Sequence, residues 1–156
     1  MKLKALTAAL SAAVITVSAG AFTAFADSGD VEINEINFPD ESFRTYVKDN
    51  CDTDDNNALS QSEIDAVHSI DVSMKKIADL KGIEYFSALT DLYCYSNQLT
   101  SLDVSQNTAL TNLSCGINQL TNLDVSKNTA LTVLNCGNNQ LTSLDVSQNT
   151  ALTRVY

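Results

Sequence analysis

LTDLYCYSNQL, at residues 89–99, is the stretch of sequence that decides the fold of this 156-residue chain. Near copies begin at residues 110 and 131, as LTNLSCGINQL and LTVLNCGNNQL, and a truncated copy begins at residue 152. Leucine, cysteine and asparagine return at the same offsets in each copy, with a period of about 21 residues. Such a period indicates a solenoid, in which each repeat is one turn and buries its apolar row only against its neighbours.

The repeated phrase has the pattern Leu-x-x-Leu-x-Cys-x-x-Asn-x-Leu, which is typical of leucine-rich repeats with cysteine at a core position. A weaker turn precedes the clear copies, with Lys75 in place of the asparagine and apolar residues at the matching offsets: Val67, Ile70, Val72 and Ile77. We therefore expect an α/β repeat fold, a leucine-rich-repeat solenoid with turns of about 21–22 residues. The expected turns are 67–88, 89–109, 110–130 and 131–151, followed by a stub at 152–156.

The second half of each repeat nearly copies the first half. Residues 99–107 have their apolar positions and asparagine at the spacing found in residues 89–97. We therefore expect two short strand-like segments per turn, on opposite sides of a flattened coil. Turns stacked about 4.8 Å apart would form ladders of leucine and cysteine inside. The asparagine rows would hydrogen-bond backbone groups of adjacent turns.

An acidic row is also expected along the solenoid. Asp103, Asp124 and Asp145 recur with the period, and Asp71, in a similar local phrase, is predicted to begin the row. Carboxylates one turn apart would repel each other by about 1 kcal/mol per pair in a water-like dielectric.

The cysteines are interpreted as packing residues. Cys94, Cys115 and Cys136 share one core position, so their side chains should point the same way on successive turns. That orientation is poor for a disulfide, and we expect small buried apolar side chains, with Cys51 free. The sequence has no Cys-x-x-Cys pair, which argues against zinc.

Residues 27–66 predict a small helical cap. FPD at residues 38–40 can begin a helix, and Phe43, Tyr46 and Val47 lie at helical offsets on one face. An acidic loop follows at 52–63, and Ile64 and Val67 then carry the apolar face onward. A helix, an acidic loop of this length and a second helix are the EF-hand arrangement.

The loop has oxygen ligands where a calcium site requires them. Calcium takes about six to eight oxygens, and the EF-hand supplies them from loop positions 1, 3, 5, 7, 9 and 12. Those positions are Asp52, Asp54, Asn56, Ala58 (through its carbonyl), Ser60 and Glu63. Asn57 replaces the usual glycine at position 6, and asparagine tolerates a left-handed backbone better than most residues. The alternative, which is compatible with calcium, is that Ser60 and Glu63 are the capping box of a helix.

These features in this order resemble the N-terminal cap and first repeats of internalin-type bacterial surface proteins. The resemblance rests on INFPD at 36–40, the acidic loop, IDVS at 70–73, GIEY at 82–85 and LTDL at 89–92, and it covers about 34–156. It implies a bacterial secreted or surface protein whose repeats bind a partner. This sequence departs from the family in two ways. The family's repeats are mostly slightly longer and have leucine in place of cysteine, and the family's cap has largely lost the calcium ligands that this sequence keeps.

Residues 1–26 have the features of a secretory signal peptide. Lys2 and Lys4 precede a mostly apolar stretch at 5–17, and Ala24 and Ala26 stand before a cleavage point at Asp27. The apolar stretch is short for a membrane span, and no second one follows in the sequence. We expect cleavage there and a secreted, extracellular protein, free or associated with the cell surface.

Composition narrows the classes of function. The net charge of −10 argues against non-specific binding to nucleic acid or anionic lipid and favours cations. The sequence has no Ser-His-Asp set, metal triad or paired acids in a cleft, and its single histidine, His68, is assigned a structural role. The sequence therefore predicts a protein that is not an enzyme.

The predicted function is a protein-binding module for adhesion or interaction, with a glycan as the other ligand class. Exposed tyrosine supplies contact area at low entropic cost. The predicted partner-binding residues, which flank the core positions of successive strands, are Asp91, Tyr93, Tyr95, Asn112, Ser114, Val133 and Asn135. An alternative is a non-catalytic targeting or docking part of a longer secreted enzyme or scaffold assembly. Dockerin-type docking modules have two calcium loops, whereas one is found here. Self-association through the open last turn is also expected.

Overall fold

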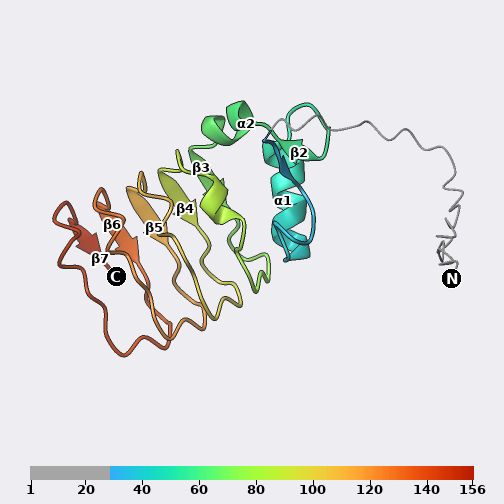
Figure 1. Ribbon diagram of the computed structural model, residues 1–156. Helices are drawn as coiled ribbons and strands as arrows, with labels where there is room; N and C mark the ends of the chain where they lie inside the picture. The colour runs from blue at the N-terminus through green and yellow to red at the C-terminus, as the bar shows by residue number, and fades with distance from the viewer. Residues whose placement is uncertain (1–28) are drawn as a thin grey trace, which may run out of the picture.

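The structure, a computed structural model, describes residues 29–156 as a row of stacked coils with a small helical cap at one end (Figure 1). The predicted signal peptide, 1–26, lies outside the described residues. The cap contains β1 (Val31–Glu32), α1 (Glu41–Cys51), β2 (Ala58–Leu59) and α2 (Gln61–Ala66). The coils contain β3 (Ser69–Asp71), a 3-10 helix (Ile83–Tyr85), β4 (Asp91–Tyr93), β5 (Asn112–Ser114), β6 (Val133–Asn135) and β7 (Arg154–Val155).

One short strand from each coil joins a parallel sheet in the order β3-β4-β5-β6-β7. Leu113 pairs with Leu92 on one side and with Leu134 on the other, so the leucines form one row. The first step of the row, from Ile70 to Leu92, is longer by a single residue than each later step. Because alternate strand residues point to opposite faces, this register sends every leucine of the row inward.

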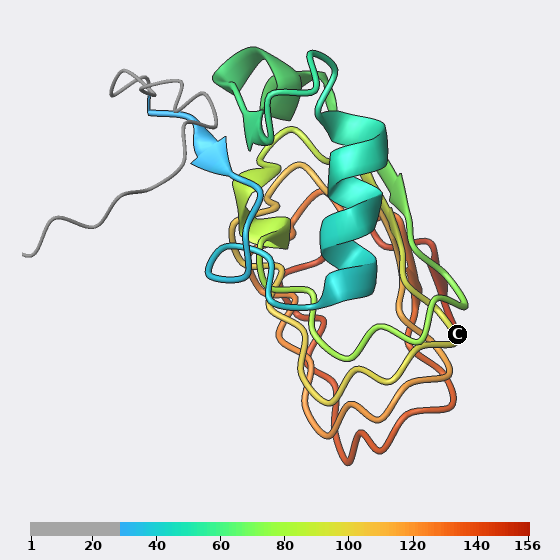
Figure 2. The same ribbon diagram turned by 90° about the vertical axis from the view of Figure 1, so that its right-hand side faces the viewer.

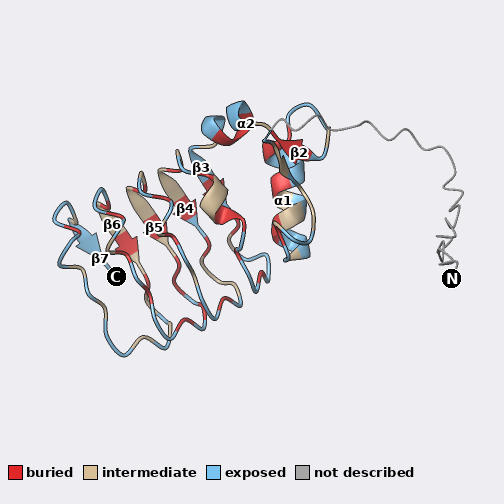
Figure 3. Cartoon of the chain, in the orientation of Figure 1, coloured by how far each residue is buried: buried red, intermediate tan, exposed pale blue. Residues whose placement is uncertain are grey.

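The interior of the stack is a continuous apolar core. The leucines of the first two copies of the repeated phrase and Phe86 are buried, and Leu141 of the third copy is partly buried. The buried positions recur along the inner side of the coils until the exposed β7 (Figure 3). Cys94, Cys115 and Cys136 are buried in one row, and all four cysteines, including Cys51, are free, as expected. Burial raises the pKa of the Cys115 thiol to about 12, so the thiol stays protonated at neutral pH.

The second strand expected in each turn is not formed, so that prediction is wrong. Residues 99–107 run without regular structure, apart from a bend at 100 and a turn at 105–106. The main-chain bond between coils at the start of this side, from Gln119 N to Leu99 O (2.9 Å), recurs once per turn. Asparagine side chains make the remaining connection, since Asn128 Nδ2 donates to Val104 O and Asn107 O, both at 2.9 Å.

Two asparagine ladders therefore connect the coils, and they differ in completeness. Asn118 Nδ2 donates to the carbonyls of Cys94 and Cys115, and its Oδ1 accepts the Leu99 N–H at 3.0 Å. In the other ladder, formed by Asn107, Asn128 and Asn149, each Nδ2 donates but the buried Oδ1 has no partner. An unpaired buried acceptor costs free energy, so the first ladder stabilises each turn more than the second.

The acidic row is held by local turns, and one expectation about it is wrong. Asp103 Oδ1 accepts the Ser105 N–H at 2.9 Å, and this hydrogen bond lowers the pKa of Asp103. Repulsion from Asp124 raises the same pKa, but its effect is smaller. The same turn recurs at Asp124 and Asp145. Asp71 does not begin this row, because it lies in β3 opposite Tyr93.

Helix α1 lies across the open end of the first coil (Figure 2). Its N-cap is Asp40, whose side chain accepts the Phe43 N–H at 3.0 Å, and its buried face is Phe43, Val47 and Cys51. Phe38 is fully buried against Gly82, where an added Cβ would lie 2.2 Å from Phe38 Cδ1. Gly82 also has a φ of 103°, so both the backbone and the contact require glycine.

Residues 31–38 connect the acidic loop to the first coil and are called the strap. Ile33 N donates to Asn57 O (2.9 Å) at the loop end. At the other end Lys81 Nζ donates to Ile36 O (2.8 Å), and Tyr85 Oη donates to Asn37 Oδ1 (3.2 Å). The loop is therefore joined to the repeats through the strap as well as through α2.

Candidate functional site

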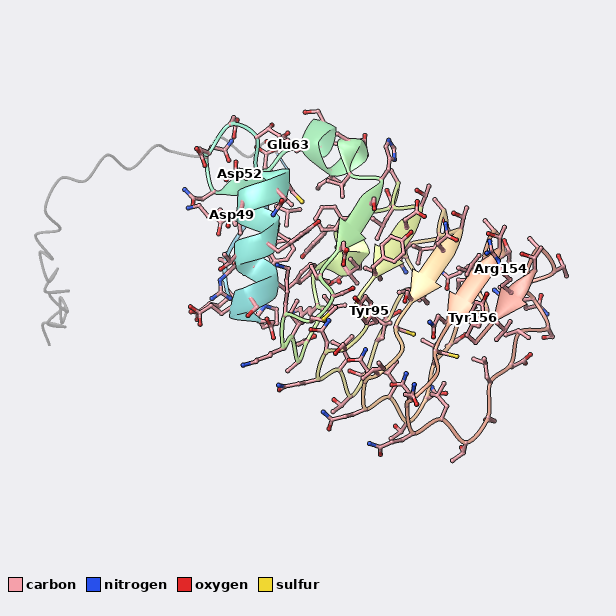
Figure 4. The ribbon with its side chains drawn as sticks, turned by 180° about the vertical axis from the view of Figure 1, so that it is seen from behind. Asp49, Asp52, Glu63, Tyr95, Arg154 and Tyr156 are labelled. Carbon is pink, nitrogen blue, oxygen red and sulfur yellow. The ribbon has the colours of Figure 1, made fainter. Side chains whose placement is uncertain are left out.

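The acidic loop between α1 and α2 brings three of its predicted ligands together. One carboxylate oxygen each from Asp52, Asp54 and Glu63 lie within 4.8 Å of one another. Asp52 and Glu63 are 7% and 8% exposed, whereas Asp54 is exposed, so the group opens to solvent on one side. Figure 4 shows Asp52 and Glu63 next to each other at the top of the cap.

Glu63 is the most heavily bonded carboxylate of the loop. Its Oε1 accepts from Thr53 N (2.6 Å) and Thr53 Oγ1 (2.7 Å), and its Oε2 accepts from Ser60 N (2.9 Å) and Ser60 Oγ (2.8 Å). Burial raises the pKa of Glu63, but these hydrogen bonds outweigh burial and lower the pKa to about 2. The capping box of α2 is therefore present, together with Thr53, which sequence reasoning missed because it stands at a non-ligand position.

The remaining loop residues hold the backbone in a tight turn. Asp52 Oδ1 accepts the Asn56 N–H (3.1 Å) and Asp52 Oδ2 accepts the Asn57 N–H (2.9 Å). Asn57 has a φ of 65°, the left-handed conformation that its glycine-like position requires. Asn56 Oδ1 accepts the Ala58 N–H (2.7 Å), and Ala58 lies in β2, which pairs with β1.

The predicted partner-binding residues lie on one face of the parallel sheet, in three rows. The first row is Asp91, Asn112, Val133 and Arg154, and the second is Tyr93, Ser114, Asn135 and Tyr156. Tyr95 lies at the head of the third row, where Gly116 and Gly137 follow it. Sequence reasoning missed Arg154 and Tyr156, although the truncated copy at residue 152 places them at the offsets of Val133 and Asn135.

A groove of about 280 Å³ is hollowed into this face over β4–β7. Its lining is Tyr93, Asn112, Leu113, Ser114, Val133, Asn135, Arg154 and Tyr156. Asp91 and Tyr95 lie outside the lining. Asp91 is held at the edge of the face, since it accepts hydrogen bonds from Asn112 Nδ2 and from Thr90 Oγ1 (2.7 Å).

His68 lies between the cap and the sheet. The side chain is exposed, and its Nδ1 is 3.1 Å from Ala88 O at the end of the same turn. This contact joins the two ends of the first turn and agrees with the structural role expected for His68.

The chain was compared with known proteins. No protein-family model matches it. Internalin J of Listeria monocytogenes is 39% identical over 71 residues, which are 46% of this chain and 8% of that protein. The solved functional domain of internalin J from L. monocytogenes, which includes a cysteine ladder, is 43% identical with a TM-score of 0.74, over 80% of this chain and 28% of that one.

The chain resembles internalin-type leucine-rich-repeat proteins. Solved structures of internalin C2 and internalin F from L. monocytogenes, each 22% identical, match 81% of this chain with TM-scores of 0.74 and 0.67, and they support the fold. The chain spans less than two thirds of each relative, covering 57% of the internalin C2 chain and 45% of the internalin F chain. The leucine-rich-repeat fold and the family resemblance are thus confirmed. Within residues 29–156, no helix has the length and apolar character needed to cross a bilayer.

Proposed function

We propose that this chain is a non-catalytic interaction module that binds a protein partner on the outward face of β4–β7. The observation that carries the proposal is the set of three aligned rows on that face, with a groove between tyrosines and polar side chains. Tyrosine, asparagine and serine are the residue types that recognition surfaces favour, because they combine contact area with adaptable hydrogen bonding.

Export to the outside of a bacterial cell is part of the same proposal. The features of 1–26 support a signal peptide, and the likeness to internalin J supports a bacterial secreted or surface-associated protein. The partner would then be another extracellular or surface protein.

The binding face is tested by replacing its tyrosines. The chain, carrying a photo-crosslinker at Ser114, is incubated with bacterial and host surface extracts, and the crosslinked proteins are identified. Tyr93→Ala with Tyr95→Ala is expected to abolish crosslinking. Gln106→Ala with Gln148→Ala, at exposed positions on the turn side of the coils, is the matched control and should leave crosslinking unchanged. Equal crosslinking by both double variants would refute the proposed face.

We propose that the loop at 52–63 binds calcium as a structural ion. Calcium–oxygen distances are about 2.3–2.6 Å, so one ion can contact three oxygens that lie within 4.8 Å of one another. The residues that would hold it are Asp52, Asp54, Asn56, Ala58, Ser60 and Glu63. The ion would supply positive charge to a loop whose acids otherwise repel one another.

Binding of the ion is tested by titration calorimetry with calcium chloride and magnesium chloride. Calcium should bind with a Kd of about 0.1–1 mM, as extracellular sites do, and magnesium more weakly, because it demands a stricter octahedral geometry. Absence of calcium heat at millimolar concentration would contradict the assignment.

A second candidate function is a targeting or docking part of a longer secreted assembly. The observation that favours it is that the 71 residues matched to internalin J are only 8% of that protein, so a similar repeat segment occurs there within a longer chain. Self-association through the exposed β7 and the last coil also remains a proposal, and sedimentation over a wide concentration range tests it.

A further inference from the structure

The groove on the sheet face has aromatic walls and a low, polar floor. Tyr93 and Tyr156 stand in one row of the sheet with Ser114 and Asn135 between them, three strand spacings or about 14 Å apart. Gly116, in the neighbouring row, is buried, and a Cβ there would lie 2.9 Å from Asn135 Oδ1. Small residues therefore keep the middle of the face low while the tyrosines rise at both ends.

Arg154 is the one charged side chain that lines this groove, and it lacks an anionic partner. It is exposed, and within residues 29–156 its guanidinium forms no side-chain hydrogen bond or ion pair. Asp91 stands in the same row but three strands away, and both of its oxygens accept hydrogen bonds from other residues. Figure 4 shows Arg154 beside Tyr156 at the end of the sheet far from the cap.

The free polar groups near Arg154 are mainly donors. Asn135 uses its Oδ1 to accept the Gly137 N–H (3.3 Å), which leaves its Nδ2 to face a ligand. The hydroxyls of Tyr93, Tyr156 and Ser114 form no hydrogen bond within the described chain and can also donate. A cation among hydrogen-bond donors is complementary to a carboxylate.

We propose that this groove binds an extended peptide segment of the protein partner through an aspartate or glutamate side chain, whose carboxylate pairs with Arg154. A guanidinium holds a carboxylate with two parallel hydrogen bonds, which fixes the orientation of the segment. Val133 and the two tyrosine rings supply apolar area for the side chain next to the acid. The inference rests on the proposed function and names the chemistry of its ligand.

The test uses a display library of short random peptides selected on the full chain. The selected peptides should share an Asp or a Glu. In one synthetic peptide from the pool, changing the acid to its amide should weaken binding about tenfold or more, and so should Arg154→Gln. The two changes together should weaken binding no further than either alone, since they remove the same interaction.

Two variants test whether binding requires the guanidinium group itself and whether it requires a positive charge at this position. Arg154→Lys keeps the charge without the bidentate geometry and should restore part of the affinity. Lys127→Gln removes one positive charge from the turn side of the coils and should leave the Kd unchanged. Thermal melts of each variant should match the unmodified chain, because both side chains are exposed.

Several results would overturn the inference. One is a pool of selected peptides that share no acidic residue, or peptide binding that Arg154→Gln leaves unchanged. The proposed function would survive either result if Tyr93→Ala still abolished peptide binding. Another is that the library yields no peptide, while the chain binds acidic glycans on a glycan microarray and this binding depends on Arg154. A third is a dimer that Arg154→Gln dissociates, because a second copy would then occupy the groove.

Discussion

The cap and the repeat array of this chain are held together by different physical means. The array repeats the same buried leucine and the same asparagine bonds in successive turns, so its stability is a sum over similar neighbours. The cap is held by single contacts: one phenylalanine against Gly82, one strap, and an acidic loop whose carboxylates bind backbone N–H groups. Apolar burial therefore dominates the array, whereas hydrogen-bonded carboxylates contribute more to the cap.

The largest expected effect lies in the array. Leu113 is 1% exposed in the middle of the leucine row, and Leu113→Ala leaves a cavity between two neighbouring coils. We expect the free energy of unfolding in urea to fall by about 2–5 kcal/mol. Thr121→Ala, at an exposed position, is the control and should change it by about 0.5 kcal/mol or less. Similar losses in both variants would contradict the description of the array.

The junction between the two regions gives the next prediction. Gly82→Ala places a Cβ 2.2 Å from Phe38 Cδ1 at a φ of 103° and should cost about 1–3 kcal/mol. Gly29→Ala is the matched control, because Gly29 also has a positive φ, of 74°, but nothing lies within 4 Å of the added Cβ. Hydrogen exchange should show α1 opening in Gly82→Ala only. Equal exchange in the two variants would mean that the contact does not couple cap and array.

The two asparagine ladders allow a finer comparison within the array. Asn118→Ala leaves the Leu99 N–H without its partner and removes one of the two donors to each of the Cys94 and Cys115 carbonyls. Asn128→Ala removes a side chain whose Oδ1 was already unpaired. We expect Asn118→Ala to destabilise the chain by about 1 kcal/mol more than Asn128→Ala. Urea denaturation of both variants measures the difference. A larger loss in Asn128→Ala would contradict the assigned order of the ladders.

The pH dependence of stability tests the contribution of Glu63 to the cap. Hydrogen bonds hold the pKa of Glu63 at about 2 in the folded chain, below its usual 4.5. A depressed folded pKa contributes stability above the unfolded pKa, and this stability is lost as the pH falls from about 5 to 2. Urea unfolding in chelator at several pH values should show that loss, reduced in Glu63→Gln. A profile that Glu63→Gln leaves unchanged would rule out Glu63 as its source.

Sequence reasoning succeeded where a residue type repeats and failed where contacts are unique. The leucine spacing predicted the strand of each turn, because its period sets which residues face the core. The second strand was wrong because Asp103 bonds to Ser105 and bends the chain locally. The strap and Thr53 had no sequence signal, since each depends on a partner that only the folded cap brings near. Arg154 did have a signal, in the offset of the truncated repeat.

The central claim is that a cation at the loop stabilises the cap and, through it, the array. The most direct measurement is a thermal melt with about 1 mM calcium against chelator. With a Kd near 0.1 mM, mass action predicts about 1.4 kcal/mol and a rise of several degrees in Tm. Asp54→Asn should lose most of this rise, because it removes one of the three converging carboxylates and leaves the Glu63 hydrogen bonds in place. Asp55→Asn is the control: it removes the same charge from outside the cluster and should keep the rise. An unmodified chain that melts at one temperature in both conditions would contradict the claim and leave the loop as an acidic helix start.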